Sequence, residues 1–217
     1  AAPIQNIGAY GTEIKDYIYE VSGINLSNGK SQIYENKLCN FSYRNSIFKG
    51  KLKNIFFITH VTIKLSKSKK LNLSYNEVNE YFRNKKSNEI TIDNVRKKII
   101  EIRESKLPDP KKLGNCGSFF KNPLVDIYFF NNLKNKYPDI VGFKNSNGMK
   151  ISAAWLIEKC GWKGYKKDNI GVYKNHALVL VNYGSDNGKI IFKLSEKIKN
   201  GVNEKFNLIL EKEVNVF

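Results

Sequence analysis

Alternating apolar and polar residues dominate the first third of the chain. Residues 17–24, 31–41 and 55–65 are rich in β-branched and aromatic side chains, and the turn-forming NLSNGK separates the first two segments. A period of two residues is typical of strands with one buried face. We therefore predict short strands, joined by turns, between residues 14 and 65.

The period changes to that of a helix after residue 75. Residues 76–84 can form one helix, and Thr91 or Asp93 can cap a second helix that carries apolar residues on one face. The second helix should end at KLPDP, residues 106–110, because a residue that precedes proline disfavours the helical conformation.

The second half of the chain mixes helical and strand patterns. Helices are expected at 122–138, 151–164 and 184–206, and strands at 176–182, 207–210 and 213–217. Gly161 stands just past the expected end of the middle helix, where glycine is common. The order of elements predicts an α+β fold, in which the last strands could rejoin the first sheet.

Composition narrows the class of protein. The 217 residues suffice for one large or two small domains, and no apolar run reaches the roughly eighteen residues of a membrane span. The three cysteines lack C-x-x-C spacing, and the chain has neither a signal peptide nor a G-x-G-x-x-G or P-loop motif. We expect a cytoplasmic protein with no metal site and no role at a membrane.

The net charge of +17 is weak evidence for a polyanionic partner such as nucleic acid. Only four of the 37 basic residues are arginine, the usual reader of bases, and the lysines are scattered along the chain. Nucleic acid is therefore not expected as a partner. A basic module that binds nucleic acid or another polyanion is the alternative function.

GNCGSFFKNP, residues 114–123, places one serine between a glycine and two phenylalanines. Glycine allows a positive φ or the close approach of a ligand, and Phe119 and Phe120 could exclude water around Ser118. Such a setting suits a proton donor. From this stretch alone, a turn before a buried strand is the simpler interpretation.

Seven ordered segments extend over the whole chain: APIQNIGAYG (2–11), YRNSIF (43–48), KLPDPK (106–111), GNCGSFFKNP (114–123), SAAWLIEKCGWKG (152–164), HALVLVN (176–182) and LEKEV (210–214). Together they resemble the UDP-N-acetylenolpyruvoylglucosamine reductases, flavoenzymes of peptidoglycan precursor synthesis. The resemblance is to the first type of this family, which has an additional loop bearing a tyrosine, here LSYNEV with Tyr75.

The resemblance implies an oxidoreductase that uses FAD and NADPH. In this family, hydride passes from NADPH to FAD and then to C3 of UDP-N-acetylglucosamine enolpyruvate, which gives UDP-N-acetylmuramate. By the same resemblance, Arg44 stabilises the enolate, Ser118 protonates C2 and Glu213 shares a proton with the enediolate. A fixed cation beside a developing enolate lowers the barrier. The simpler alternatives are a surface salt bridge for Arg44 and an exposed carboxylate for Glu213, with Glu211 on the same strand face as a competitor.

The resemblance also implies the binding residues. Substrate contacts are expected from five residues: Tyr43, Tyr75, Lys106, Asn122 and His176. His176 stands where some members have glutamine, and either side chain can donate a hydrogen bond. Flavin contacts are expected from APIQNIGAYG, namely Pro3, Ile4, Gln5, Asn6, Gly8 and Gly11.

The family has a further domain, with half of the flavin site, ahead of the position of Ala1. The resemblance therefore implies a truncated, monomeric chain of impaired flavin binding. It predicts part of a flavin-binding α+β domain at 1–110, completed by return strands at 206–217, and a smaller α+β substrate-binding domain at 111–205. A stretch that binds the UDP-sugar without catalysis is a third interpretation.

Overall fold

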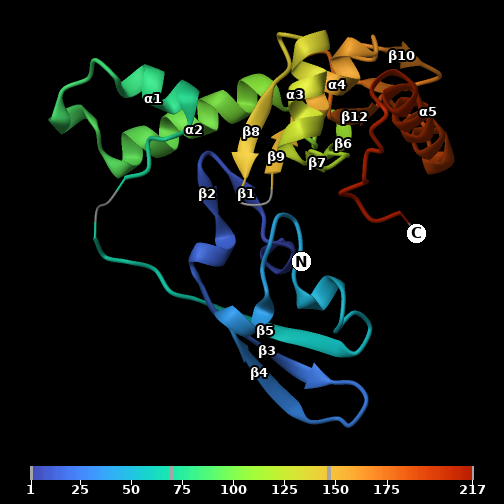
Figure 1. The fold of residues 1–217 in the computed structure, drawn as a ribbon. Coiled ribbons are helices and arrows are strands. Elements are labelled where there is room, and N and C mark those ends of the chain that lie inside the picture. Colours follow the sequence, from blue (N-terminus) through green and yellow to red (C-terminus); the bar gives the residue numbers. More distant parts are fainter. Residues whose placement is uncertain (1, 69–70, 146–147, 217) are drawn as a thin grey trace. The chain divides into compact units, whose positions relative to one another are not determined.

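A computed structural model describes residues 2–68, 71–145 and 148–216 (Figure 1). The chain divides into two compact units, Ala1–Ile100 and Glu101–Phe217. Both combine helices with antiparallel sheets, so the α+β class expected from the sequence is confirmed.

The first unit contains a three-stranded antiparallel sheet of order β4–β3–β5. The strands are β3 (Ile18–Asn25), β4 (Ser31–Glu35) and β5 (Phe56–Ile63). All three strands expected from the alternating pattern are confirmed. β4 is shorter than expected because Asn36–Cys39 form the 3-10 helix η3.

A small apolar core lies under one face of this sheet. The rings of Phe48 and Phe56 pack at 5.6 Å and both contact the ring of Tyr34, while Val21 is fully buried. The other face is open, since Ile33 and Phe57 are 62% and 60% exposed. Register explains this division, because successive residues of a strand point to opposite faces.

Short elements surround the sheet. They are the 3-10 helices η1 (Pro3–Gln5), η2 (Ile14–Asp16) and η4 (Ile47–Lys49), and the strands β1 (Gly8–Ala9) and β2 (Thr12–Glu13). Tyr10 and Gly11 connect β1 to β2 with φ values of 53° and 80°. Positive φ at both turn residues defines the two-residue hairpin loop whose twist matches that of its strands.

Two α-helices, α1 (Asn76–Phe82) and α2 (Ile92–Lys106), follow, with η5 (Ser87–Glu89) between them. Both helices were expected. Thr91 is the cap, because its hydroxyl accepts a hydrogen bond from the amide of Asn94 at 3.2 Å. α2 ends at Lys106, before Pro108, as predicted.

The described residues of the second unit form two antiparallel sheets and three further α-helices. Its sheets have the orders β10–β11–β12–β6 and β7–β9–β8. The elements are β6 (Gly114–Ser118), β7 (Leu124–Val125), α3 (Ile127–Lys136), β8 (Gly142–Asn145), β9 (Gly148–Ile151), α4 (Ala153–Lys159), β10 (Lys166–Lys167), β11 (Ile170–Val172), β12 (Val179–Asn182) and α5 (Gly188–Phe206).

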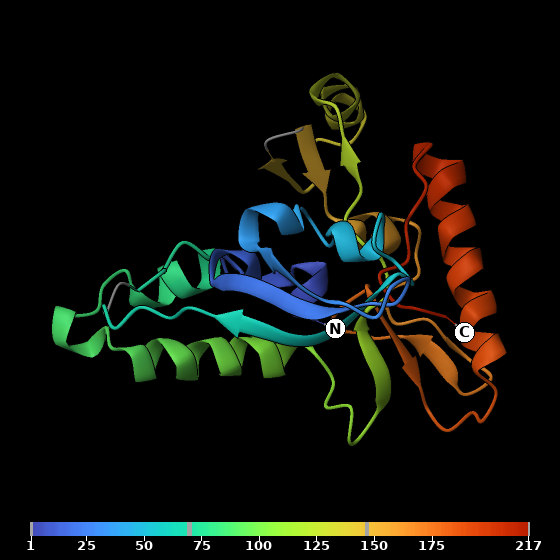
Figure 2. The same ribbon diagram turned by 90° about the horizontal axis from the view of Figure 1, so that it is seen from below.

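α5 packs against β11 and β12 and forms much of the core of this unit (Figures 1 and 2). Ile198 and Val202 of α5 are fully buried, and the rings of Trp155 and Phe206 lie 5.6 Å apart. The apolar residues at helical spacing along α5 account for this packing. Among the described residues, no helix is long and apolar enough to cross a membrane.

Three predictions for the second half need correction or refinement. The helix expected at 122–138 begins only at Ile127, because Asp126 caps it and the two residues before form β7. The strands expected at 207–210 and 213–217 do not form, apart from a bridge between Lys212 and Phe120. The segment instead buries Leu208 and Leu210 in the core of the second unit, and residue 217 lies outside the described residues.

The helices expected at 151–164 and 184–206 are confirmed as α4 and α5. Gly161 follows α4 with a φ of 78°, as its position predicted. The contact-based division falls at residue 100, whereas the predicted boundary lies at 110. The assignment of flavin and substrate binding to domains 1–110 and 111–205 stays a prediction.

Candidate functional site

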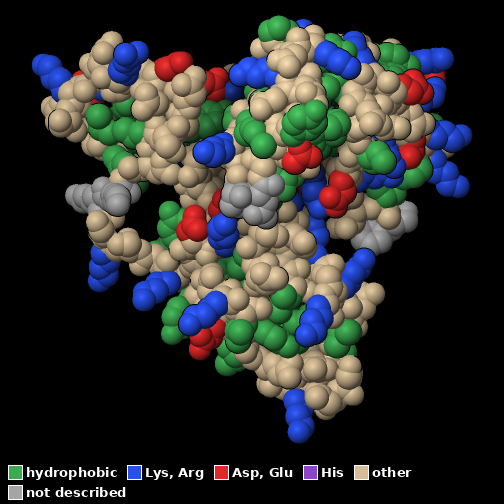
Figure 3. Space-filling model, viewed as in Figure 1, with side chains coloured by type: hydrophobic (Ala, Val, Ile, Leu, Met, Phe, Trp, Pro, Cys, Tyr) green, Lys and Arg blue, Asp and Glu red, His purple; other side chains and the backbone are tan. Residues whose placement is uncertain are grey.

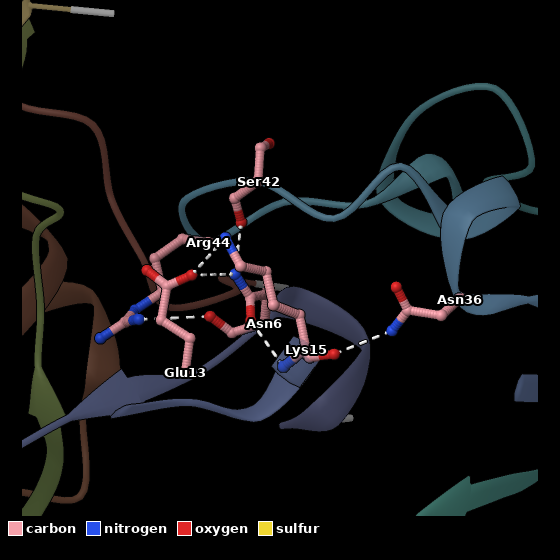
Figure 4. A network of polar contacts seen from close by, with 6 residues as sticks. All are labelled: Asn6, Glu13, Lys15, Asn36, Ser42 and Arg44. Atoms are coloured by element: carbon pink, nitrogen blue, oxygen red, sulfur yellow. Dashed lines mark hydrogen bonds and ion pairs between the residues drawn. The ribbon is translucent and has the colours of Figure 1, made fainter. Parts of the chain in front are cut away.

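Arg44 lies in a tight turn of the first unit. Ser42 and Asn45 close the turn by two backbone hydrogen bonds of 3.1 and 3.2 Å, and Arg44 has a φ of 53°. Its Nη2 donates to the carbonyl oxygen of Gly8 at 3.1 Å. Its Nη1 donates to the carbonyl oxygen of Asn6 at 3.4 Å (Figure 4). The guanidinium also lies 5.3 Å from the centre of the Tyr43 ring. These contacts fix the direction of an otherwise flexible cation.

The segment predicted to bind flavin contacts the Arg44 turn. Lys49 Nζ donates to the side chain of Gln5 at 3.3 Å and to the carbonyl oxygen of Arg44 at 3.1 Å. The side chain of Asn6 is buried and hydrogen-bonded to Glu13, Lys15 and Ser42. The structure therefore brings Gln5 and Asn6 together with the predicted catalytic arginine.

The two glycines predicted to approach the flavin make room for the chain itself. A Cβ on Gly8 would lie 2.9 Å from Glu13 Cγ, and one on Gly11 would lie 2.4 Å from Ser74 Oγ. Asn72 also donates to the carbonyl oxygen of Gly11 at 2.7 Å. These glycines are explained by close packing within the first unit, and their flavin contacts stay a prediction, as do those of Pro3 and Ile4.

Tyr75 belongs to the same packing. Its ring meets the ring of Tyr10 edge to face, with centroids 4.9 Å apart. The loop that carries Tyr75 is thus attached to the β1–β2 turn at two points, the tyrosine pair and the Asn72 hydrogen bond. Aromatic pairs of this geometry stabilise beyond the area that they bury.

Ser118 is the last residue of β6 in the second unit, opposite Val179 of β12. Gly117 before it has a φ of 72°, and nothing lies within 4 Å of the position that a Cβ would take. Phe119 and Phe120 are buried in the core. The segment is a strand rather than the turn of the simpler interpretation, and open space adjoins it at Gly117.

Glu213 lies on the segment that runs beside this strand. Its amide donates to the carbonyl oxygen of Phe119 at 2.9 Å, and the amide of Lys121 donates to Glu211 at 2.8 Å. The carboxylate of Glu211 pairs with the ammonium of Lys121, whose side chain is 13% exposed. Ser118 and Glu213 are therefore brought together along the backbone, while the competing carboxylate is engaged by a lysine.

His176, one of the predicted substrate ligands, is largely removed from solvent. Burial first, and the nearby charges of Lys106 and Lys163 second, hold the pKa of His176 below its usual value. Its Nδ1 accepts a hydrogen bond from the amide of Leu178 at 3.3 Å. A neutral ring with an accepting Nδ1 carries its proton on Nε2, which is therefore a donor.

The structure places Lys106 near His176 and adds a second cation, Lys163, that the sequence analysis missed. Lys163 pairs with Glu158 at 3.0 Å and follows the helix end in GWKG, a position without a distinctive sequence signal. Asn122 Oδ1 accepts a hydrogen bond from the amide of Ala153 at 2.9 Å. Any ligand contact of Asn122 would therefore most naturally use Nδ2 as the donor.

A cavity of about 990 Å³ lies beside the same strand in the second unit. It is lined by Cys116, Phe119, Asp186, Asn187, Gly188, Lys189, Phe192, Val214, Asn215 and Val216. Burial raises the pKa of the Cys116 thiol, which keeps it protonated. Of the lining residues, Phe119 and Val214 directly follow Ser118 and Glu213 in the sequence, while Ser118 and Glu213 themselves do not line the cavity.

Basic side chains do not gather into one stripe on the face drawn in Figure 3, where they are scattered among hydrophobic and acidic ones. Within the described residues, no group of three or more His, Cys, Asp or Glu side chains is arranged to hold a metal ion.

Comparison with known proteins identifies the family. Residues 109–217, half of the chain, match the family model of the UDP-N-acetylenolpyruvoylglucosamine reductase C-terminal domain. The chain belongs to this family. The matched part includes Ser118, Asn122, His176 and Glu213, so the resemblance stated from the sequence is confirmed.

Relatives in the reductase family match over the whole chain. The UDP-N-acetylenolpyruvoylglucosamine reductases of Amoebophilus asiaticus and Flavobacterium johnsoniae are 43% and 44% identical over 100% and 99% of the chain. The crystal structure of the Thermus caldophilus reductase is similar in fold, with a TM-score of 0.61 and 21% identity over 100% of the chain and 59% of its own. The chain spans 64% of the length of both curated relatives.

Proposed function

We propose that the protein containing this chain reduces UDP-N-acetylglucosamine enolpyruvate to UDP-N-acetylmuramate, with FAD as its cofactor and NADPH as the hydride donor. The observation that carries the proposal is the family match over residues 109–217, which includes both the serine and the glutamate expected of such a reductase. The backbone pairing that sets Glu213 beside the Ser118 strand supports it.

FAD, when bound, would accept hydride from NADPH and pass it to C3 of the substrate. Ser46, next to the Arg44 turn, fits a nearby ligand because its buried hydroxyl has no hydrogen-bond partner among the described residues. Gln5 and the backbone of residues 3–11 would hold the flavin from this side. Asn6 would contribute only through its backbone, since its side chain is committed to protein contacts.

The chain's own residues would stabilise the charge that hydride addition creates. Addition at C3 leaves an enolate across C2 and the substrate carboxylate, and Arg44 supplies a fixed positive charge for it. Glu213 would share a proton with the developing enediolate. Ser118 would then donate its hydroxyl proton to C2, a transfer favoured by a site from which water is excluded.

Substrate recognition would combine charge with hydrogen bonds. Lys106 supplies a cation for the diphosphate, and the neutral His176 supplies an Nε2 donor beside it. Asn122 would donate through Nδ2, and Tyr43 and Tyr75 would donate through their hydroxyls. We place this monomeric reductase in the cytoplasm, where its nucleotide-linked substrates are made.

Flavin absorbance during the two half-reactions of the full-length protein tests the proposal. Flavin should be reduced by NADPH and reoxidised by UDP-N-acetylglucosamine enolpyruvate. Glu213→Gln should slow only the reoxidation, by about 10²-fold or more. Glu211→Gln is the matched control and should leave both rates unchanged, because Glu211 is paired with Lys121. A protein that retains no flavin, or flavin that the substrate fails to reoxidise, would refute the proposal.

A further inference from the structure

Asn6 is the most completely enclosed polar side chain near the candidate site (Figure 4). Its Nδ2 donates to the carbonyl oxygen of Ser42 at 2.9 Å and to Glu13 Oε2 at 3.0 Å, and its Oδ1 accepts from the amide of Lys15 at 3.0 Å. These bonds fix the orientation of the amide, because a flipped group would set its oxygen against two acceptors.

Asn6 makes two contacts with the turn that carries Arg44, one through its side chain and one through its main chain. The side chain of Asn6 holds the carbonyl of Ser42, the first residue of the turn. The main-chain carbonyl of Asn6 accepts from Arg44 Nη1 at 3.4 Å. The carbonyl of Asn6 points toward Arg44 because Asn6 adopts a left-handed conformation, with φ 50° and ψ 63°.

Residue chemistry explains why asparagine suits this position. Outside glycine, asparagine is among the residues that best tolerate the left-handed region. Glycine would supply the conformation without the donor to Ser42, and aspartate would supply an acceptor beside Glu13 where a donor is needed. Arg44 has no such tolerance at its own φ of 53° and depends on external contacts.

We propose that Asn6 is a positioning residue for Arg44 and that its side chain is not a flavin ligand. The role of Arg44 in this inference rests on the proposed reductase function. Asn6 aims the guanidinium by holding the first residue of the turn with its side chain and the guanidinium itself with its main-chain carbonyl, so loss of the side chain lets the cation move away from the developing enolate.

Asn36 provides a matched control within the same network. Its Nδ2 donates to the carbonyl oxygens of Lys15 and Ile18 at 2.8 and 2.7 Å. Asn36 thus donates two side-chain hydrogen bonds, as Asn6 does, and both go to residues outside the Arg44 turn. Figure 4 shows the bond from Asn36 to Lys15. Loss of the Asn6 side chain removes three hydrogen bonds, one of them to the Arg44 turn, whereas loss of the Asn36 side chain removes two, neither of them to that turn.

The kinetic test uses full-length protein with Asn6→Asp, Asn6→Gly or Asn36→Ala. Reduction of flavin by NADPH should be unchanged in Asn36→Ala and should slow far less than reoxidation in the two Asn6 variants. Reoxidation by UDP-N-acetylglucosamine enolpyruvate should fall about 10- to 100-fold in the two Asn6 variants, the usual effect of a displaced catalytic group, and not in Asn36→Ala. Loss of flavin and equal slowing of both half-reactions in Asn6→Gly would make Asn6 a flavin ligand and overturn the inference.

A double mutant shows whether Asn6 acts through Arg44. If it does, Asn6→Gly should cause no further loss of reoxidation when added to Arg44→Ala. A loss in the double mutant that equals the product of the two single effects would mean that Asn6 acts independently, and the inference would be wrong.

Trypsin provides a readout that does not depend on the reaction. Local opening of the turn exposes the peptide bond after Arg44, so cleavage of the native full-length protein there should be faster in both Asn6 variants than in the wild type or Asn36→Ala. Equal cleavage rates would overturn the inference even if the protein is the proposed reductase. Faster cleavage without turnover of the enolpyruvyl sugar would support the link between Asn6 and Arg44 and refute the reductase function instead.

Discussion

Arg44 in the first unit and Ser118 in the second are held by different kinds of interaction. The guanidinium of Arg44 depends on two carbonyl oxygens and a left-handed turn. Ser118 lies on a strand whose neighbouring residue Phe120 is 1% exposed, and the segment of Glu213 is anchored by Leu210, also 1% exposed. Arg44 is thus held by directional polar contacts, whereas Ser118 and Glu213 are held by segments that pack at the edge of an apolar core.

The apolar cores of the two units also differ, in how completely they are enclosed. The core cluster of the first unit, which includes Ile18 and Val21, lies under one face of a sheet whose other face exposes Ile33 and Phe57. The second unit surrounds its core with two sheets and three helices. Apolar packing is collective, whereas a hydrogen bond depends on one donor and one acceptor. We therefore expect single polar substitutions to matter most in the first unit and core substitutions to matter most in the second.

The largest effect is expected from Ser118→Ala in full-length protein. Flavin reduction by NADPH should be nearly unchanged, while reoxidation by the enolpyruvyl sugar should fall by about 10²- to 10⁴-fold, the contribution of a positioned general acid. Stopped-flow absorbance of the flavin measures each half-reaction separately. Ser118→Cys should recover part of the rate, and equal slowing of both halves would make Ser118 a packing residue.

Core stability should differ between the units. Ile198→Ala in the second unit should lower the free energy of unfolding by about 4 to 5 kcal/mol, and Ile18→Ala in the first by about 2 kcal/mol, the two ends of the range for this substitution. The reason is that a sheet with one open face can relax into the cavity more fully. Hydrogen exchange of the full-length protein, resolved by unit, measures both, and equal losses would contradict the comparison.

Lys106→Ala should separate binding from chemistry. The KM for the enolpyruvyl sugar should rise about 10- to 100-fold, the equivalent of one charge-assisted hydrogen bond, with little change in kcat. Arg44→Ala should do the reverse and mainly slow hydride transfer to the substrate. Lys112→Ala, at an exposed position, is the control. Similar changes in both parameters for Lys106→Ala and Arg44→Ala would refute this division of roles.

The smallest effect concerns His176 and pH. Because its pKa is lowered in the folded protein, the unfolded state binds more protons between that pKa and the ordinary value of about 6.5. Its contribution to stability is complete above this range and is lost as the pH falls through the folded pKa. His176→Gln should make the melting temperature less sensitive to acid between pH 7 and 5. An unchanged pH dependence would show that His176 is not the titrating group.

Long periodic segments were predictable from the sequence, and short ones were not. β3, β5, α2 and α5 have enough residues for the period of two or of 3.6 to emerge. The β8–β9 and β10–β11 hairpins have strands of only two to four residues, too short for a periodic signal. The tail after α5 has an alternating pattern, yet only Lys212 finds a bridge partner among the described residues.

The site divides in the same manner. Motif similarity assigned roles to Arg44, Ser118 and Glu213. The hydrogen bonds around these residues, however, join positions that are far apart in the sequence. Asn6 meets Arg44 across 38 positions, and Lys121 meets Glu211 across 90. No pattern within one segment encodes such pairs, which arise only when the chain folds. For the same reason, the sequence could not show that Gly11 lies close to Ser74.

Both tryptophans of the chain, Trp155 and Trp162, pack against the core of the second unit. Indole emission from this part of the protein therefore reports on one unit alone. The first unit contains tyrosines but no tryptophan. Local unfolding of this unit would therefore leave the tryptophan emission maximum unchanged. A tryptophan placed at Phe57, on the open face of the first sheet, would give the silent unit an optical signal of its own.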